Sequence, residues 1–338
     1  MAIFGHDTAA ALRRVGHTSQ LGGLKQYTLN AGRAAGIRAV DFRTTQGLEF
    51  TVLLDRGMDI SEARYRGQSL CWRSPAGDVA PGFYNPRGLE WLRTFTGGLL
   101  TTCGLTNVGP ATAESDETGL HGRFSAVAAE EVAVEEDWSG ESPVLRVSGL
   151  LREASLFGAN LEVRRTITAR GDGKALCLRD TITNVGSRTS PCMLLYHINL
   201  GFPLIDAGTE LQLTGSKCEP RDAEAADGQA EWGKMSAPIA GYEEKVYFHT
   251  ITPDAEGKAT VTVRNPKLGL GVRLRYDPAE LPCFTEWKMM GEKEYVLGTE
   301  PGNCRPMGRE AERAAGRLVE LAVGQQITAG FGFEVVEG

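Results

Sequence analysis

The chain has 338 residues, of which 41% are apolar and 23% charged, and its formal net charge is −7. This composition is typical of a globular protein with a sizeable core and excludes a disordered or fibrous chain. Lys and Arg are scattered instead of gathered in a stripe, so we expect no nucleic-acid partner. No apolar stretch approaches the ~18 residues of a membrane span, and the N-terminus lacks the pattern of a signal peptide. We therefore expect a cytoplasmic protein without a membrane partner.

The first predicted element is a helix in residues 6–16, within an N-terminal extension of residues 1–25. From there the chain alternates apolar and polar residues in short runs broken by Gly, Pro, Asn and Asp, which is typical of strands. Thirteen runs fit this pattern: residues 27–30, 37–44, 50–55, 144–151, 161–169, 175–184, 192–200, 245–251, 259–265, 271–276, 294–300, 317–323 and 328–336.

Helical patterning otherwise occurs only in residues 88–95 and 308–316, and residues 219–240 have the polar composition of a long surface loop. The predicted fold class is therefore all-β: one large antiparallel β-sandwich with a few short helices. No linker divides the chain, so we expect residues 1–338 to form a single domain. The seven cysteines have no metal-ligand spacing, which indicates reduced core residues.

Three glycine-containing segments carry ionisable or polar residues that a plain sheet does not need. LLDRGMDI places Arg56 at a strand end or bulge, where it could bind hydroxyl pairs or simply form a surface ion pair. TGGLLTTCGLTNVGP, which contains Asn107, allows close approach of backbone to a ligand or merely forms tight turns. GLHGRFS exposes His121 between glycines and next to Arg123, and a ligand contact there competes with an incidental histidine.

A fourth candidate site joins two distant strands. LLYHINLGFP places His197 and YVLGTEPGNC places Glu300 where an apolar strand gives way to Gly or Pro. A rigid sandwich can hold an acid and a base at such positions while loops shape the pocket around them.

GLHGRFS, LYHINLGFP and LGTEPGNC occur in the order and approximate spacing of signature segments of the aldose 1-epimerase superfamily, which the chain resembles over about residues 25–336. LLDRGMDI, GGLLTTCGLTNVGP and GLHGR more specifically resemble its divergent branch classed as a domain of unknown function. The resemblance implies a galactose mutarotase-like supersandwich, a small-molecule sugar as ligand, and an isomerase that exchanges sugar anomers.

The resemblance also implies roles for individual residues. Glu300 would remove the proton of the anomeric hydroxyl, and His197 would protonate the ring oxygen. His121 and Arg56 would contact the sugar. The superfamily's hydroxyl-binding aspartate has no clear counterpart, and Glu286 or Lys288 could occupy its place.

Two polar residues, Arg123 and Asn107, are further candidates for binding the substrate. Trp287 and Trp72 could each present a flat apolar surface to a sugar or belong to the core.

Opening a cyclic hemiacetal requires one proton to leave the anomeric hydroxyl and another to reach the ring oxygen, which a Glu and His pair supplies without metal or cofactor. We expect the Glu300 carboxylate to raise the pKa of His197 and so favour its imidazolium. One alternative is a metal-dependent sugar isomerase with His121, His197, His249 and Glu300 as ligands. Another is a carbohydrate-binding protein without catalysis. The chain could also form a homodimer.

Overall fold

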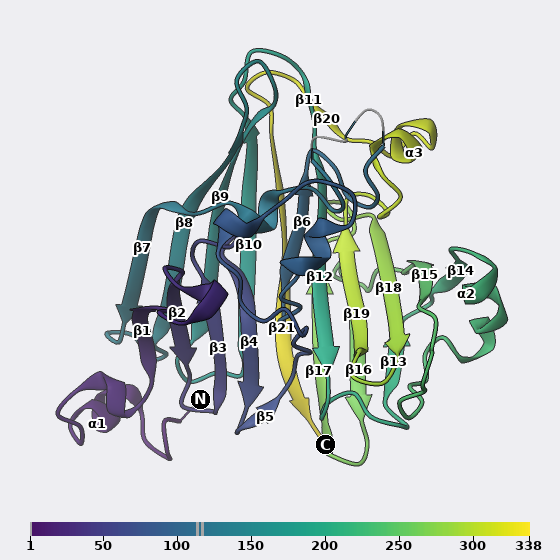
Figure 1. The fold of residues 1–338 in the computed structure, drawn as a ribbon. Coiled ribbons are helices and arrows are strands. Elements are labelled where there is room, and N and C mark those ends of the chain that lie inside the picture. Colours follow the sequence, from purple (N-terminus) through teal and green to yellow (C-terminus); the bar gives the residue numbers. More distant parts are fainter. Residues whose placement is uncertain (1, 113–114, 116–117) are drawn as a thin grey trace.

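The computed structural model describes residues 2–112, 115 and 118–338 and confirms the predicted all-β class. Three antiparallel sheets form two layers: a five-stranded and a six-stranded sheet lie side by side in front of an eight-stranded sheet (Figure 1). An isolated bridge between Ile60 and Leu100 joins the two front sheets. None of the helices within the described residues is long and apolar enough to cross a membrane.

The five-stranded sheet runs in chain order, and the larger sheets combine distant segments. The five-stranded sheet comprises β1 (Gly23–Thr28), β2 (Arg38–Arg43), β3 (Leu48–Leu53), β4 (Asp59–Tyr65) and β5 (Gln68–Ser69). The six-stranded sheet, in spatial order, comprises β14 (Lys217–Pro220), β15 (Lys245–Thr250), β18 (Cys283–Met290), β19 (Tyr295–Gly302), β12 (Met193–Gly201) and β6 (Thr101–Leu105).

The eight-stranded sheet forms the rear layer. In spatial order it comprises β13 (Glu210–Leu213), β16 (Ala259–Asn265), β17 (Leu270–Tyr276), β21 (Gln326–Glu337), β10 (Ala175–Asn184), β9 (Asn160–Arg170), β8 (Val144–Ala154) and β7 (Glu130–Asp137). β11 (Ser190–Pro191) and β20 (Glu320–Leu321) form a separate short pair. β9 alternates buried and less buried residues, because only one face of this sheet contacts the core.

The helical elements are short. They are α1 (Thr8–Leu12), α2 (Ala223–Asp227), α3 (Arg309–Ala314) and the 3₁₀ turns η1 (Thr18–Gln20), η2 (Gly32–Ala34), η3 (Pro81–Phe83), η4 (Glu90–Arg93), η5 (Phe124–Ala126) and η6 (Gln229–Glu231). The helix expected in residues 88–95 is thus only the turn η4. Residues 219–240, expected to be a plain loop, contain the second half of β14 as well as α2 and η6.

A buried charge cluster ties the rear sheet to β12 of the six-stranded sheet. Arg165 on β9 has no exposed surface, and its guanidinium lies 2.7 Å from a carboxylate oxygen of Asp180 and 3.1 Å from one of Asp59. The hydroxyl of Tyr196 on β12 donates to Asp180 at 2.8 Å. Because Tyr196 precedes His197 in an extended strand, the two side chains leave β12 on opposite faces. The cluster therefore fixes the strand that presents His197 on its other side.

Candidate active site

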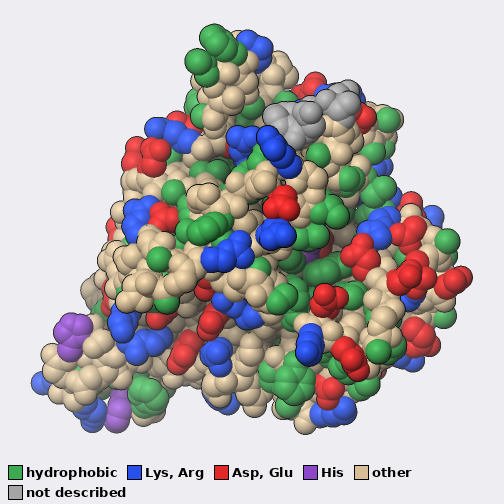
Figure 2. Space-filling view, viewed as in Figure 1, with side chains coloured by type: hydrophobic (Ala, Val, Ile, Leu, Met, Phe, Trp, Pro, Cys, Tyr) green, Lys and Arg blue, Asp and Glu red, His purple; other side chains and the backbone are tan. Residues whose placement is uncertain are grey.

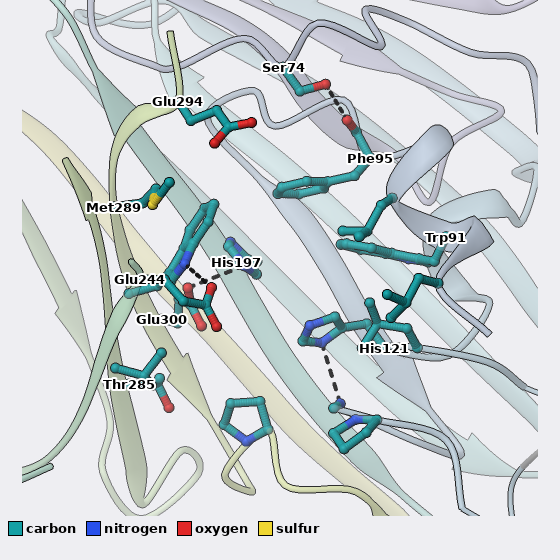
Figure 3. Close-up of a pocket in the computed structure, with 18 of the residues that line it drawn as sticks. Ser74, Trp91, Phe95, His121, His197, Glu244, Thr285, Met289, Glu294 and Glu300 are labelled. Atoms are coloured by element: carbon teal, nitrogen blue, oxygen red, sulfur yellow. Dashed lines mark hydrogen bonds and ion pairs between the residues drawn. The ribbon is translucent and has the colours of Figure 1, made fainter. Parts of the chain in front are cut away.

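The residues of β12, β15, β18 and β19 form one wall of a cavity of about 590 Å³ on the outer face of the six-stranded sheet. The loops around residues 72–76, 89–95 and 109–121 form the opposite wall. In Figure 3, Glu300, His197 and Glu244 lie on the sheet wall, and Trp91 and His121 face them from the loop wall.

The sheet register places an acid and a base side by side. β12 and β19 pair antiparallel, with Leu195 opposite Gly302 and Ile198 opposite Thr299, so His197 lies across from Glu300. Nε2 of His197 is 3.3 Å from Oε1 of Glu300, and their side chains are 8% and 2% exposed. His197 lies in the middle of β12 and not at its end.

The next strand extends this row, because Thr285 of β18 is paired with Glu300. Three buried polar atoms of the row have no hydrogen-bond partner within the described part of the chain: Nδ1 of His197, Oε1 of Glu300 and Oγ1 of Thr285. Nε2 of His197 and Oε1 of Glu300 are close enough for an ion pair, but the two groups are not aligned for a hydrogen bond. Buried polar groups are nearly always satisfied in proteins, so three such atoms in one cavity indicate a polar ligand.

Burial controls the protonation of this pair in the free cavity. It raises the pKa of Glu300 well above its usual value, and the charge of Glu244 adds to the effect. Burial, and next the neighbouring His121, lowers the pKa of His197 to about 3. The expected rise in the His197 pKa is therefore wrong for the free cavity, because loss of hydration outweighs the effect of a carboxyl group that itself favours its neutral form.

His121 reaches the cavity from a tight turn. Its φ is +56°, and a Cβ on the adjacent Gly122 would collide with the backbone oxygen of Gly104. Nδ1 of His121 accepts a hydrogen bond from the backbone N–H of Gly109 at 3.3 Å, so the proton of its neutral ring is on Nε2. Burial lowers the pKa of His121 to about 4. His121 is therefore a neutral hydrogen-bond donor, with its ring centroid 6.0 Å from that of His197.

Three other predicted residues lie outside the cavity. The Arg56 guanidinium donates to the backbone oxygens of Val79 at 2.8 Å and Thr94 at 2.9 Å, and so supports the loop wall from behind. Arg123 lines a separate hollow. Asn107 is buried; its amide donates to the backbone oxygens of Gly109 and Gly119, and it thereby fixes the turn that carries His121.

Residues of β18 divide between the two faces of the sheet, because successive side chains in a strand point in opposite directions. Thr285, Trp287 and Met289 line the cavity. The predicted sugar-binding residues Glu286 and Lys288 point away from it: Glu286 Oε2 is 2.9 Å from Nε2 of His249, and Nζ of Lys288 donates to backbone oxygens of residues 231–234. Lys288 thus holds residues 231–234 against the back of the wall, and Glu286 links β18 to β15 through His249.

The alternative metal site does not assemble. His249 pairs with Glu286 on the opposite face from the cavity, whereas His121, His197 and Glu300 line it. No group of three or more His, Cys, Asp or Glu among the described residues could hold a metal ion.

Sequence reasoning missed Glu244 and Thr285. Glu244 precedes β15; its Oε2 accepts a hydrogen bond from Nε1 of Trp287 at 2.7 Å, and its Oε1 lies 3.1 Å from Arg221. Glu244, and not Glu286, thus places a carboxylate in the cavity, but no local motif marks it. Thr285 could have been found, since strand alternation puts it on the same face as Trp287.

The layered sheets have the galactose mutarotase-like β-sandwich fold. A solved structure of a candidate aldose 1-epimerase from Klebsiella pneumoniae has a TM-score of 0.88 at 24% identity and covers 95% of this chain and 86% of that one. A galactose mutarotase-like protein from Clostridium acetobutylicum gives 0.63 at 14%, with 94% and 100% covered. Galactose 1-epimerase from Lactobacillus acidophilus gives 0.62 at 11%, with 94% and 99% covered.

Residues 34–335 match the family described as Domain of unknown function (DUF4432), and the chain therefore belongs to that family. A comparison with curated protein sequences gave no match.

Proposed function

We propose that the chain is an isomerase of the aldose 1-epimerase type, which interconverts the anomers of a sugar by acid and base catalysis. The observation that carries the proposal is the row of three unpartnered polar atoms on His197, Glu300 and Thr285 inside one cavity. A sugar offers hydroxyl groups that both donate and accept, and so can satisfy all three. The names of the structural neighbours, an aldose 1-epimerase among them, agree with this ligand.

The reaction needs one proton acceptor and one proton donor. Glu300 accepts the proton of the anomeric hydroxyl while His197 donates a proton to the ring oxygen, and the bond between C1 and the ring oxygen breaks to give the open-chain aldehyde. Rotation about the bond between C1 and C2 presents the other face of the carbonyl. Ring closure then returns both protons, so the pair ends in its starting state.

The pair contains one transferable proton, and its position depends on the ligand. In the free cavity the raised pKa of Glu300 and the lowered pKa of His197 place it on Glu300. A bound sugar donates a hydroxyl to the carboxylate and accepts from the imidazolium, which favours transfer of this proton across the 3.3 Å between them. The sugar itself thereby prepares the base and the acid.

Neighbouring side chains orient the ring. His121 donates from Nε2 to a sugar oxygen, and the indole of Trp287 packs against the C–H face of the sugar. Glu244, held by Trp287 Nε1 and by Arg221, accepts hydroxyl groups at the side of the cavity.

The test is anomer-exchange NMR on a panel of aldoses, comparing the wild type with Glu300→Gln and His197→Asn. We expect saturation transfer between the anomers of at least one sugar, and its loss in both variants, with the thermal unfolding midpoint little changed. Glu256→Gln, at an exposed glutamate, is the matched control and should retain exchange. Absence of exchange with every sugar, exchange that a chelator abolishes, or full activity of Glu300→Gln would contradict the proposal.

A further inference from the structure

The cavity is larger than one sugar ring requires. A water molecule occupies about 30 Å³ in the liquid, and a covalently bonded ring atom occupies less, so the about 12 non-hydrogen atoms of a hexose need less than about 360 Å³. The cavity measures about 590 Å³. The remaining space is comparable to much of a second ring.

The space that one sugar ring would leave unfilled lies toward solvent. His197, Glu300 and His121 form the buried end of the cavity, and Trp91, only 3% exposed, packs on His121 with ring centroids 4.9 Å apart. Leu89 and Leu92, next to Trp91 on and beside η4, also line the cavity but are 68% and 50% exposed. Exposed apolar side chains at the rim of a cavity are a feature of ligand-binding surfaces, because the fold alone gains nothing from them.

The rest of the mouth is polar, and Figure 2 shows acidic side chains at the edge of this hollow with hydrophobic ones inside it. Glu294 lines the cavity and has no hydrogen-bond or ion-pair partner among the described residues. Arg221, the one Lys or Arg on the described lining, is engaged by Asp222 at 2.7 Å and Glu244 at 3.1 Å. The mouth therefore offers an apolar surface and a free carboxylate, but no free cation for a phosphate or sulfonate.

This combination fits a second pyranose ring, which presents an apolar C–H face and a hydroxyl-bearing edge. A hydrocarbon chain would leave the Glu294 carboxylate facing apolar surface, which is unfavourable. When C1 of the reacting ring lies at the buried acid and base pair, C4 lies across the ring and points to the mouth. A substituent at that position therefore extends into the mouth, whose lining includes Leu89 and Leu92.

We propose that the mouth of the cavity is a second sugar subsite, and that the preferred substrate is an uncharged reducing disaccharide linked through C4 of its reducing ring. This inference rests on the proposed anomer exchange for the position of C1. It assigns Leu89 and Leu92 to the C–H face of the second ring and Glu294 to its hydroxyl groups.

The test compares each monosaccharide with its C4-linked disaccharide: glucose with cellobiose and maltose, galactose with 4-galactobiose, and mannose with 4-mannobiose. Anomer exchange gives kcat/KM for the wild type, and calorimetry with Glu300→Gln gives affinity without turnover. We expect a preference of about tenfold for one disaccharide over its monosaccharide, which corresponds to ~1.4 kcal/mol and to the burial of about 55 Å² of apolar surface.

Substitutions at the mouth test the second subsite separately from the buried acid and base pair. The double variant Leu89→Ser and Leu92→Ser should lose most of this preference, measured as the ratio of disaccharide to monosaccharide kcat/KM. Leu156→Ser, at a leucine that is 83% exposed in the turn between β8 and β9, is the matched control and should keep the ratio.

The outcomes distinguish the two proposals. Exchange of monosaccharides without any preference for disaccharides, or a preference that survives the double variant, would overturn the second subsite and leave the isomerase intact. Tighter disaccharide binding to Glu300→Gln without exchange by the wild type would overturn the isomerase and leave the subsite intact. No exchange and no binding of any sugar would overturn both.

Discussion

Gly298 on β19 leaves the space that the Glu300 side chain occupies. The two residues are separated by one position in an extended strand and therefore face the same side of the sheet. A Cβ built on Gly298 would lie 2.3 Å from Oε1 of Glu300 and 2.9 Å from Cβ of Trp287. Ordinary contact begins at 3.4 Å, so Gly298→Ala must displace the carboxylate by about 1.1 Å.

A displacement of this size should affect catalysis much more than stability. A misplacement of ~1 Å at a reacting group can reduce the rate about 10²-fold, so we expect kcat to fall by about that factor. The backbone of β19 keeps its hydrogen bonds, and the Glu300 carboxylate is the end of a flexible side chain, but Cβ of Trp287, at 2.9 Å, must also give way by about 0.5 Å. The thermal midpoint should therefore fall only modestly, with the protein still folded under the conditions of the assay.

Anomer-exchange NMR gives kcat, and thermal unfolding by circular dichroism gives the midpoint. Gly332→Ala on β21 is the matched control, because a Cβ there would meet only a backbone oxygen of Arg275 at 4.0 Å. Wild-type kcat in Gly298→Ala would refute the reasoning, since Glu300 could then work from a different position. A loss of kcat that accompanies unfolding would refute it too.

Three further predictions concern the cavity and its support. Between pH 7.5 and about 5, kcat/KM should not fall at the ordinary histidine pKa of ~6.5. The pair gains a second proton only near the lowered pKa of His197, about 3, and it loses its single proton only above the raised pKa of Glu300. An acidic limb near pH 6.5 in the rate profile argues against this pair. Thr285→Val should reduce kcat/KM about fivefold, the value of one hydrogen bond, without lowering stability in a denaturant titration, and equal kinetics would show that Thr285 does not touch the sugar. Lys288→Met should lower the free energy of unfolding by ~1–3 kcal/mol through loss of its bonds to the backbone of residues 231–234, and an unchanged denaturation midpoint would exclude this role.

The strand content and the presence of His197 and Glu300 on buried strands could be predicted because they depend on local patterns, although His197 lies at the centre of its strand and not at the predicted end. β12 and β19 are buried at every position, so β12 and the first half of β19 appear in the sequence as apolar runs, in or after which an ionisable side chain stands out. His121 stands out for a similar reason, since its neighbouring glycines adopt conformations that other residues rarely do.

The contacts of other residues depend on tertiary structure. Arg56 follows a strand in a way that is typical of a ligand-binding residue, but its guanidinium is buried against backbone oxygens of a loop 23 and 38 residues further along the chain. Glu286 and Glu244 are both acidic residues near Trp287. Alternation along β18 turns Glu286 away from the face of Trp287, whereas the proximity of Glu244 to Trp287 depends on the pairing of β15 with β18, which no local pattern reveals. The pKa of His197 depends on how completely the loop wall excludes water, which no local pattern reveals.

The two faces of β18 have a consequence for redesign of the protein. Thr285, Trp287 and Met289 can be varied together as a specificity library, because their side chains leave β18 on the cavity face, opposite to the face where Glu286 and Lys288 bind their partners. Glu286 and Lys288 should be held constant in such a library, since they maintain the shape of the scaffold. One strand of alternating side chains thus allows ligand preference and structural integrity to be selected independently.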